Sequence, residues 1–208
     1  MGSSPFPRLV FVEGGRRWAN AEDLTGSGAS MKMAIGAWWI RSYESRDLEA
    51  LMRYADNRAV SMHLRDAFPY PYRRRHAESW LGLALGQSVE SHFAIATRKE
   101  LIGGIGFQPQ EDVYRKSAEI GYWVAEPYWG RGIATLAVRE MTRYVFSHFP
   151  IVRLFANVFE GNPASERVLE KCGYVYEGTM RKSVYKERAY RDQKIYALLR
   201  EDWMNTQP

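Results

Sequence analysis

The stretch AEIGYWVAEPYWGRGIAT, residues 118–135, decides the fold that this sequence predicts. β-branched and aromatic residues in 118–125 indicate a strand, Glu126-Pro127 opens a turn, and residues 130–134 lead into an amphipathic helix. The glycines of the turn carry no side chains that would keep an anion from the backbone, and a helix start offers unpartnered N–H groups. A phosphate is therefore the predicted ligand. The alternative is a tight turn that only lets strand and helix pack.

Commoner phosphate-binding motifs do not fit this turn. A P-loop needs Gly-Lys-Ser or Gly-Lys-Thr, which the chain lacks, and a dinucleotide fingerprint needs a third glycine where Thr135 stands. The segment from Trp129 to Ala134 instead resembles the acyl-CoA pyrophosphate loop of the GCN5-related N-acetyltransferase (GNAT) superfamily, in its RimJ/RimL-like branch of ribosomal-protein N-acetyltransferases. Trp129 stands where the family commonly has Gln or Arg.

Three further segments carry the same resemblance, in the expected order, over about residues 35 to 203. They are the FPYPY run at 68–72, the segment from Asn157 to Tyr174, and the ending with Tyr190-Arg191-Asp192 and Asp202-Trp203. The resemblance implies an α/β GNAT fold, with a mixed, mostly antiparallel central sheet that is splayed at its middle and carries helices on both faces. It also implies acetyl-CoA as the donor substrate.

The resemblance further implies roles for individual residues. Glu119 would be the general base, and Ser165 would replace the acidic tyrosine of many relatives, whose place is taken here by Leu169. The implied acetyl-CoA-binding residues are Tyr122, Trp123, Val124, Trp129, Gly130, Arg131, Gly132, Ile133, Ala134, Thr135, Asn157, Asn162, Ser165 and Lys171. The implied acceptor-binding residues are Phe68, Tyr70, Tyr72 and Glu119.

Each of these roles has a structural alternative. Glu119 could be a strand-end carboxylate held by a neighbouring Arg or Lys, and Ser165 could only cap or pack its helix. The aromatic residues of 68–72 could simply plug the core, and the basic run 73–76 could be solvated rather than bind phosphate or an acidic peptide. Cys172 lies in a helical apolar stripe, which favours a core position over a nucleophile.

Composition sets the outer limits. The chain has 208 residues, 46% hydrophobic and 25% charged, which fits one ordinary globular domain. A net charge of +5 favours acidic partners such as a phosphorylated cofactor, an acidic protein or RNA. A single cysteine and no metal-ligand spacing around His63 or His76 predict no internal disulfide and no metal. The absence of a long apolar run predicts no membrane span, and we expect a cytoplasmic protein.

Hydrophobic periodicity predicts the order of the elements. Strands are expected at 38–40, 93–97, 101–107, 118–125, 153–159, 174–178 and 195–199, and helices at 48–55, 75–86, 131–148 and 163–172. Asn162-Pro163 is a favoured helix start and Gly173 a favoured helix end. We expect residues 1–32 to form a flexible N-terminal extension and residues 33–208 to form the domain.

These observations predict an N-acetyltransferase that moves an acetyl group from acetyl-CoA to a primary amine, most simply a protein or peptide N-terminal α-amine. The amine would attack directly in a ternary complex, because the chain offers no convincing covalent nucleophile. Backbone N–H groups near Val124 would stabilise the oxyanion. Alternatives are a small-amine acetyltransferase, for a polyamine or an aminoglycoside, and a catalytically weak ribosome- or RNA-associated binding module. Nucleic acid is expected only through a ribosome, and the protein is expected to be a monomer or homodimer.

Overall fold

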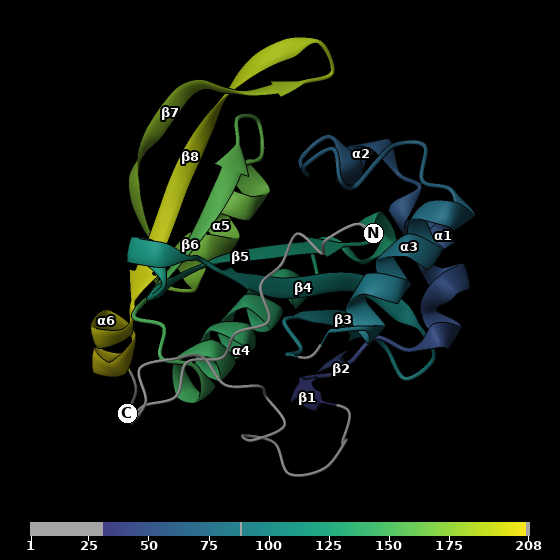
Figure 1. Ribbon diagram of the computed structural model, residues 1–208, viewed down its shortest axis with the longest axis horizontal. Helices are drawn as coiled ribbons and strands as arrows, with labels where there is room; N and C mark the ends of the chain where they lie inside the picture. Colours follow the sequence, from purple (N-terminus) through teal and green to yellow (C-terminus); the bar gives the residue numbers. More distant parts are fainter. Residues whose placement is uncertain (1–30, 88, 207–208) are drawn as a thin grey trace.

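A computed structural model describes residues 31–87 and 89–206. The described strands form one eight-stranded sheet in the order β1-β2-β3-β4-β5-β6-β8-β7 (Figure 1). The strands are β1 (Lys32–Ile35), β2 (Trp38–Arg41), β3 (His92–Ala96), β4 (Leu101–Pro109), β5 (Ser117–Val124), β6 (Arg153–Phe159), β7 (Val175–Lys186) and β8 (Ala189–Leu199). The α-helices are α1 (Leu48–Ala55), α2 (Arg58–Ser61), α3 (Arg74–Leu85), α4 (Ile133–His148), α5 (Pro163–Lys171) and α6 (Arg200–Asn205). Short 3-10 turns are η2 (Ser45–Asp47), η3 (Asp112–Tyr114) and η4 (Glu126–Tyr128).

Neighbouring strands run antiparallel except at one place. β5 and β6 are parallel and pair through only three residue pairs, the last of them Glu119 with Phe155. Beyond that pair β5 stays with β4, up to the partners Val124 and Gly103, while β6 stays with β8. The predicted mixed sheet with a splayed middle is therefore confirmed, and the gap between β5 and β6 is where a ligand could enter.

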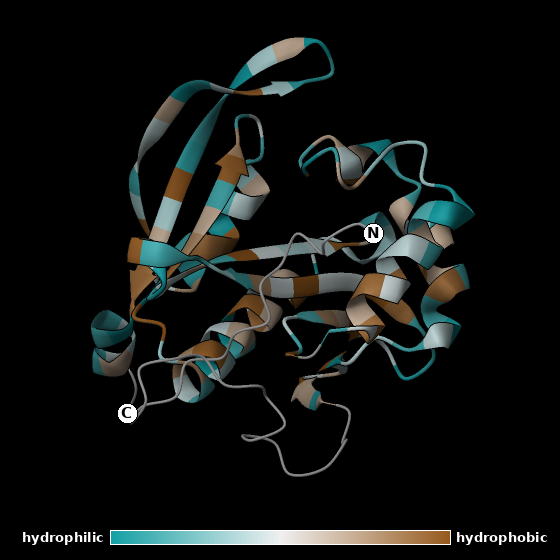
Figure 2. Cartoon of the chain, in the orientation of Figure 1, coloured by the Kyte–Doolittle hydropathy of each residue, from teal (hydrophilic) through white to brown (hydrophobic). Residues whose placement is uncertain are grey.

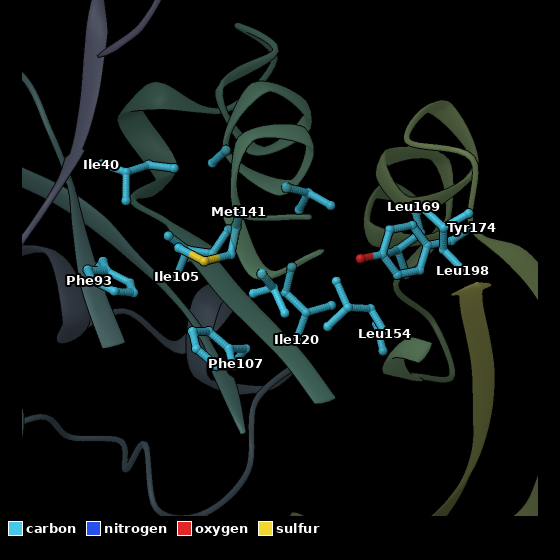
Figure 3. Packing of buried hydrophobic residues seen from close by; sticks show 14 of the residues in the cluster. Ile40, Phe93, Ile105, Phe107, Ile120, Met141, Leu154, Leu169, Tyr174 and Leu198 are labelled. Carbon is cyan, nitrogen blue, oxygen red and sulfur yellow. The ribbon is translucent and has the colours of Figure 1, made fainter. Parts of the chain in front are cut away.

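Helices cover both faces of the sheet, each over its own apolar cluster. One cluster lies under α4 and includes Ile105, Ile120 and Met141, all at most 3% exposed (Figure 3). The other lies under α1 and α3 and includes Leu51 and Leu81. The predicted apolar face of α4 is confirmed by the buried residues of that helix. The two clusters hold β4 and β5 from opposite faces, which fixes the strands that border the gap.

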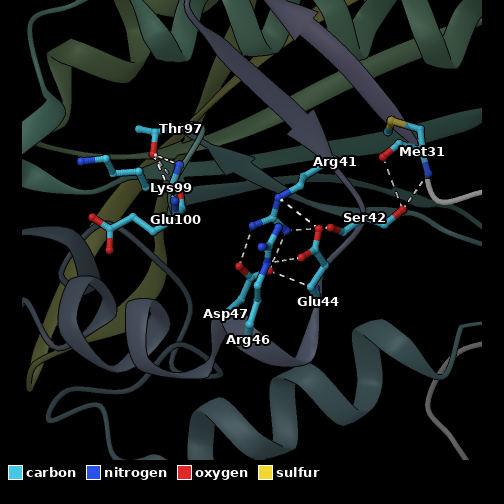
Figure 4. A network of polar contacts seen from close by, with 9 residues as sticks. All are labelled: Met31, Arg41, Ser42, Glu44, Arg46, Asp47, Thr97, Lys99 and Glu100. Carbon is cyan, nitrogen blue, oxygen red and sulfur yellow. Dashed lines mark hydrogen bonds and ion pairs between the residues drawn. The ribbon is translucent and has the colours of Figure 1, made fainter.

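A buried ion pair joins the first strands to α1. Two nitrogens of Arg41 donate to the two carboxylate oxygens of Asp47, at 2.7 and 2.6 Å, and the N–H of Glu44 also donates to Asp47 (Figure 4). A bidentate arginine–carboxylate pair fixes orientation as well as distance. The pair therefore sets the direction in which the chain leaves β2 for the helices around the cleft.

The structure corrects several predicted boundaries. α4 begins at Ile133 rather than at residue 131, because Gly132 has a left-handed φ of +75° that cannot belong to the helix. The polar segment expected between two short last strands is instead paired, so β7 and β8 form one long hairpin whose turn is hydrophilic (Figure 2). β1 and the terminal helix α6 were not predicted, because both are too short to show a period. Residues 1–30 lie outside the described residues, so the extension and its boundary remain predictions.

Candidate active site

A cleft of about 1070 Å³ opens at the gap between β5 and β6. Its walls come from β4, β5 and β6, from the segment that follows α2, and from the starts of α4 and α5. Every site residue predicted from the sequence lines this cleft except Tyr70, whose side chain is 52% exposed outside it. The predicted residues thus meet in one place, although they come from segments up to a hundred residues apart.

The start of α4 forms one end of the cleft. Gly130 and Gly132 both have φ of +75°, and a Cβ added at either would meet no atom within 4 Å. The backbone N–H of Leu136 makes the first helical bond, to the carbonyl of Gly132, so the N–H groups before it have no partner inside the helix. These donors line an open turn at the positive end of a 16-residue helix. The residues present therefore fit a phosphate group.

Arg131 lies within this turn and is held toward the 3-10 turn η4. Its guanidinium donates to the carbonyl of Pro127 at 3.1 Å and lies 5.3 Å from the centre of the Tyr128 ring. The side chain is exposed, so the charge stays available to a ligand at the mouth of the turn. A diphosphate would meet both backbone donors and this cation.

The edge of β5 facing the gap presents main-chain groups. The N–H of Ala125 donates to Ile102 on the β4 side at 2.8 Å, and N–H directions alternate along a strand, so the N–H of Val124 points into the gap. The carbonyl of Val124 accepts a 2.6 Å hydrogen bond from the indole of Trp129. Trp129, which stands where the family commonly has Gln or Arg, thus binds the carbonyl of Val124 and leaves the N–H of Val124 available to a ligand.

Glu119 lies deeper, where β5 and β6 part. One carboxylate oxygen is paired with Arg65 and the other accepts from the side-chain amide of Asn157 at 3.0 Å. The side chain of Glu119 is 18% exposed and that of Arg65 is 66% exposed. Glu119 is therefore held by an arginine, as the structural alternative predicted, and it also lies inside the cleft. The remaining amide oxygen of Asn157 is buried and has no hydrogen-bond partner among the described residues.

A pair of hydroxyl groups bridges the gap near the start of α5. The hydroxyl oxygens of Tyr122 and Ser165 are 2.8 Å apart. The backbone N–H of Ser165 donates to the side chain of Asn162 at 3.2 Å, which confirms Asn162 as the helix cap. Burial raises the pKa of Tyr122 above its ordinary value. Leu169, at the place of the family's tyrosine, is fully buried in the core and cannot contact a ligand.

Aromatic residues wall the opposite side of the cleft. The ring of Phe68 lies 5.3 Å from Trp123 and 5.2 Å from Tyr72, and Tyr72 is only 6% exposed. The 68–72 segment therefore does both things that were predicted as alternatives: Tyr72 packs in the core, and Phe68 and Tyr72 line the cleft. Arg65 was not anticipated, because it follows a four-residue helix in a segment without a hydrophobic period.

His63 is a second cleft residue that sequence reasoning missed. Its Nδ1 is buried without a hydrogen-bond partner among the described residues. Burial, and secondarily the charge of Arg191, lowers the pKa of His63 below its ordinary value. The lowered pKa disfavours the cationic form of His63, so this residue adds little positive charge to this part of the cleft.

Other residues singled out from the sequence have structural partners. Cys172 packs against the core, its thiol donates to the carbonyl of Thr135 at 3.4 Å, and burial raises its pKa to about 11. In the basic run, Arg74 pairs with Glu49 and the imidazole of His76 accepts from the N–H of Arg73. Among the described residues no cluster of His, Cys, Asp or Glu could hold a metal ion, and no helix has the length and apolarity to cross a membrane.

A split sheet with a strand N–H aimed into the split, beside a glycine-rich helix start that fits a diphosphate, is the arrangement that the resemblance to acyl-CoA-dependent acyltransferases implies. The family model "Acetyltransferase (GNAT) domain" matches residues 38–175. The chain therefore belongs to the GNAT acetyltransferase family. Members of this family use acetyl-CoA, so the protein is an acetyl-CoA-dependent N-acetyltransferase.

Individual relatives agree with this assignment. The chain is 30% identical over 169 residues to "Uncharacterized N-acetyltransferase YnaD" of Bacillus subtilis, covering 79% of this chain and 94% of that protein. It is 32% identical over 105 residues to the ribosomal-protein-serine acetyltransferase of Escherichia coli, covering 50% and 58% respectively. It is also 24% identical over 168 residues to the spermidine N(1)-acetyltransferase of Vibrio cholerae, covering 80% and 95%.

Solved structures show the same fold. Mycobacterium smegmatis RimJ in complex with a CoA-disulfide is similar with a TM-score of 0.69 and 25% identity, over 84% of this chain and 87% of that one. RimL, a ribosomal L7/L12 α-N-protein acetyltransferase in complex with coenzyme A, is similar in fold with a TM-score of 0.73 and 22% identity, over 83% and 99%.

Proposed function

We propose that the protein acetylates the N-terminal α-amine of a polypeptide, by direct attack of the amine on acetyl-CoA in a ternary complex. The acceptor would be a ribosomal protein or another chain met in the cytoplasm, as the names of the E. coli and RimJ/RimL relatives suggest. An α-amine has a pKa of about 8 and a lysine side chain about 10.4, so an α-amine loses its proton more easily near neutral pH.

One observation carries the choice of acceptor. The carboxylates that line the cleft are Asp66 and Glu119, and both are engaged by cations, Lys186 and Arg65 respectively. A polyamine or an aminoglycoside carries several positive charges that need carboxylate partners when they leave water. A peptide N-terminus carries one charge, which is lost when the amine reacts. The charge of the cleft therefore favours a peptide end.

In this proposal Glu119 takes the proton of the amine and the N–H of Val124 binds the developing oxyanion. Asn157 orients Glu119 through its side-chain amide. Ser165 is the candidate for protonating the leaving thiolate. Tyr122 holds the Ser165 hydroxyl through their 2.8 Å contact, and the raised pKa of Tyr122 disfavours loss of its own proton.

The second candidate is transfer to a small amine. It is favoured by the spermidine acetyltransferase of V. cholerae, 95% of which is covered by the similarity. The two candidates differ in the groups that the cleft must offer. A polycation needs unpaired carboxylates, and the carboxylates of this cleft are already paired with cations.

The test is acetylation by the purified protein of a mixed panel of acceptors, read by mass spectrometry. The panel holds peptides with free N-termini, the same peptides with blocked N-termini and an internal lysine, spermidine and an aminoglycoside. The proposal expects one added acetyl group, on the α-amine of free peptides only. Faster transfer to spermidine or to the aminoglycoside than to every free peptide would contradict it.

A further inference from the structure

The β7–β8 hairpin projects beyond the rest of the sheet (Figure 1). At this turn, Glu187 accepts two hydrogen bonds from the guanidinium of Arg58, at 3.1 and 3.0 Å. Beside it, Lys186 donates to the carboxylate of Asp66 and to the carbonyl of Leu64, both at 2.8 Å. Leu64 and Asp66 line the cleft. The hairpin is therefore anchored at the cleft mouth.

The hairpin carries more positive charge than this anchoring uses. Lys186 is only 8% exposed and pairs with Asp66, and Arg191 pairs with Glu187. Arg181, Lys182 and Arg188 are exposed, and none of them has an ion-pair partner in the part of the chain that the structure describes. We call these three residues the basic tip. Exposed cations without carboxylate partners give this part of the hairpin a positive potential, which attracts an anionic partner.

The basic tip has no evident structural task. Residues 181–183 and 187–190 are exposed, and within 181–191 only Lys186 is buried, so this part of the hairpin adds little to the core. The hairpin rises about 3.3 Å per residue, which places Arg181 about 16 Å along the strand from the anchoring Lys186. An extended peptide whose first residue entered the cleft would cover this distance with about five residues.

We propose that the basic tip binds an acidic stretch of the acceptor polypeptide while its N-terminus lies in the cleft. This inference rests on the proposed function and adds a substrate class to it: polypeptides with aspartate or glutamate residues several positions after the reacting amine. Arg65 lies between the hairpin and the cleft floor, but it is paired with Glu119, so the positive charge available to the acceptor is that of the basic tip.

RNA is the other anionic partner that a basic surface could bind, and the hairpin fits it less well. Single-stranded nucleic acid is bound by cations together with aromatic faces that are free to stack on bases. The described part of the hairpin has three exposed tyrosines, and each contacts another ring: Tyr185 and Tyr190 have ring centres 5.1 Å apart, and Tyr176 lies 5.6 Å from Tyr196. Glu187 and Asp192 also interrupt the positive charge. A polypeptide, with discrete carboxylates, matches this surface better than a continuous phosphate backbone.

The test uses peptides that share their first four residues. One peptide ends there, and two continue to about 16 residues, long enough at 3.3 Å per residue to reach the tip, with either an acidic or a neutral polar tail. The tip variant is Arg181→Glu with Lys182→Glu and Arg188→Glu. The matched control is Arg98→Glu with Lys99→Glu and Arg115→Glu, which makes the same charge change at exposed residues that neither line the cleft nor belong to the hairpin.

With the unaltered protein, we expect kcat/KM for the acidic peptide to exceed that for the neutral one by about tenfold at low salt, and the difference to shrink at high salt. The tip variant should lose this preference but acetylate the four-residue peptide at the unaltered rate. The control variant should keep the preference. An equal preference in the tip variant would overturn the inference.

Two further readouts separate this inference from the proposed function. An acidic peptide whose N-terminus is already acetylated should bind the unaltered protein more tightly than the tip variant, measured by fluorescence anisotropy, even if no peptide is acetylated. Acetylation of every peptide without regard to its tail would leave the function intact and refute the docking of an acidic stretch. Loss of RNA retention in the tip variant, with the peptide preference unchanged, would assign the hairpin to RNA instead.

Discussion

Replacing Gly132 by valine tests the phosphate end of the cleft. Gly132 caps α4 at φ +75°, and a Cβ there would meet no protein atom within 4 Å. The valine side chain would therefore occupy the space in front of the backbone donors at the start of the helix. Loss of one hydrogen bond to a charged group costs about 1.5–3 kcal/mol, which is roughly a 10- to 150-fold rise in KM for acetyl-CoA. We expect kcat to change much less, because this end binds the donor equally in the ground and transition states.

The same substitution has a second, purely conformational effect. A side chain at a left-handed position costs about 1–2 kcal/mol, which for a protein of this size lowers the melting temperature by about 2–8 °C. Gly36→Val is the matched control: Gly36 has φ +73°, its Cβ would lie 3.8 Å from Leu136, and it does not line the cleft. Both variants should lose similar thermal stability by calorimetry, but only Gly132→Val should raise the KM for acetyl-CoA in steady-state kinetics. An unchanged KM in Gly132→Val would refute the assignment of this turn.

Two more predictions concern ionisable groups of the cleft. Glu119→Gln should lower kcat by about 10²–10⁴ at neutral pH, with partial recovery as the pH approaches the pKa of the amine, about 8; rates against pH measure this. Arg65→Gln should change the rate for a neutral peptide only a few-fold, and an equal loss in both variants would mean that Glu119 acts only as the partner of Arg65. His92 lies in the cleft wall, and burial lowers its pKa from 6.5 to about 4. Because the unfolded chain binds the proton first, the stability that neutral His92 contributes is present above pH 6.5 and is lost as the pH falls toward 4. Urea unfolding of His92→Asn should show a weaker fall over this range, and an unchanged slope would contradict the burial of a neutral imidazole.

Much of the fold could be predicted because its signals are local. The strand, turn and helix of residues 118–135 show their periods directly, and Asn162 and Gly173 mark the ends of α5 by their chemistry. The β7–β8 hairpin could not be predicted in full. Large parts of both its faces contact water, so polar and apolar residues need not alternate along it; β7 buries only Lys186, and the buried stretch of the hairpin is residues 196–198 of β8.

The site was predictable where a residue's role depends on its own strand or helix. Glu119 was placed in the site by the resemblance of residues 118–135 to the GNAT family, and the open turn follows from Gly130 and Gly132. The partners of these residues depend on pairings distant in the chain: Arg65 reaches Glu119 across 54 positions, and Tyr122 reaches Ser165 across 43. Such contacts have no local signal in a single sequence.

The short seam between β5 and β6 has a further consequence for the mechanics of the protein. Only three residue pairs connect the two halves of the sheet, so most of the β5 edge beyond Glu119 has no strand beside it. An extended ligand with amide groups could hydrogen-bond to this free edge of β5 as a strand does, and would then lie between the two halves of the sheet. Binding of acetyl-CoA would then make the sheet more rigid. It would also slow hydrogen exchange of the Val124 N–H, which faces the gap between β5 and β6.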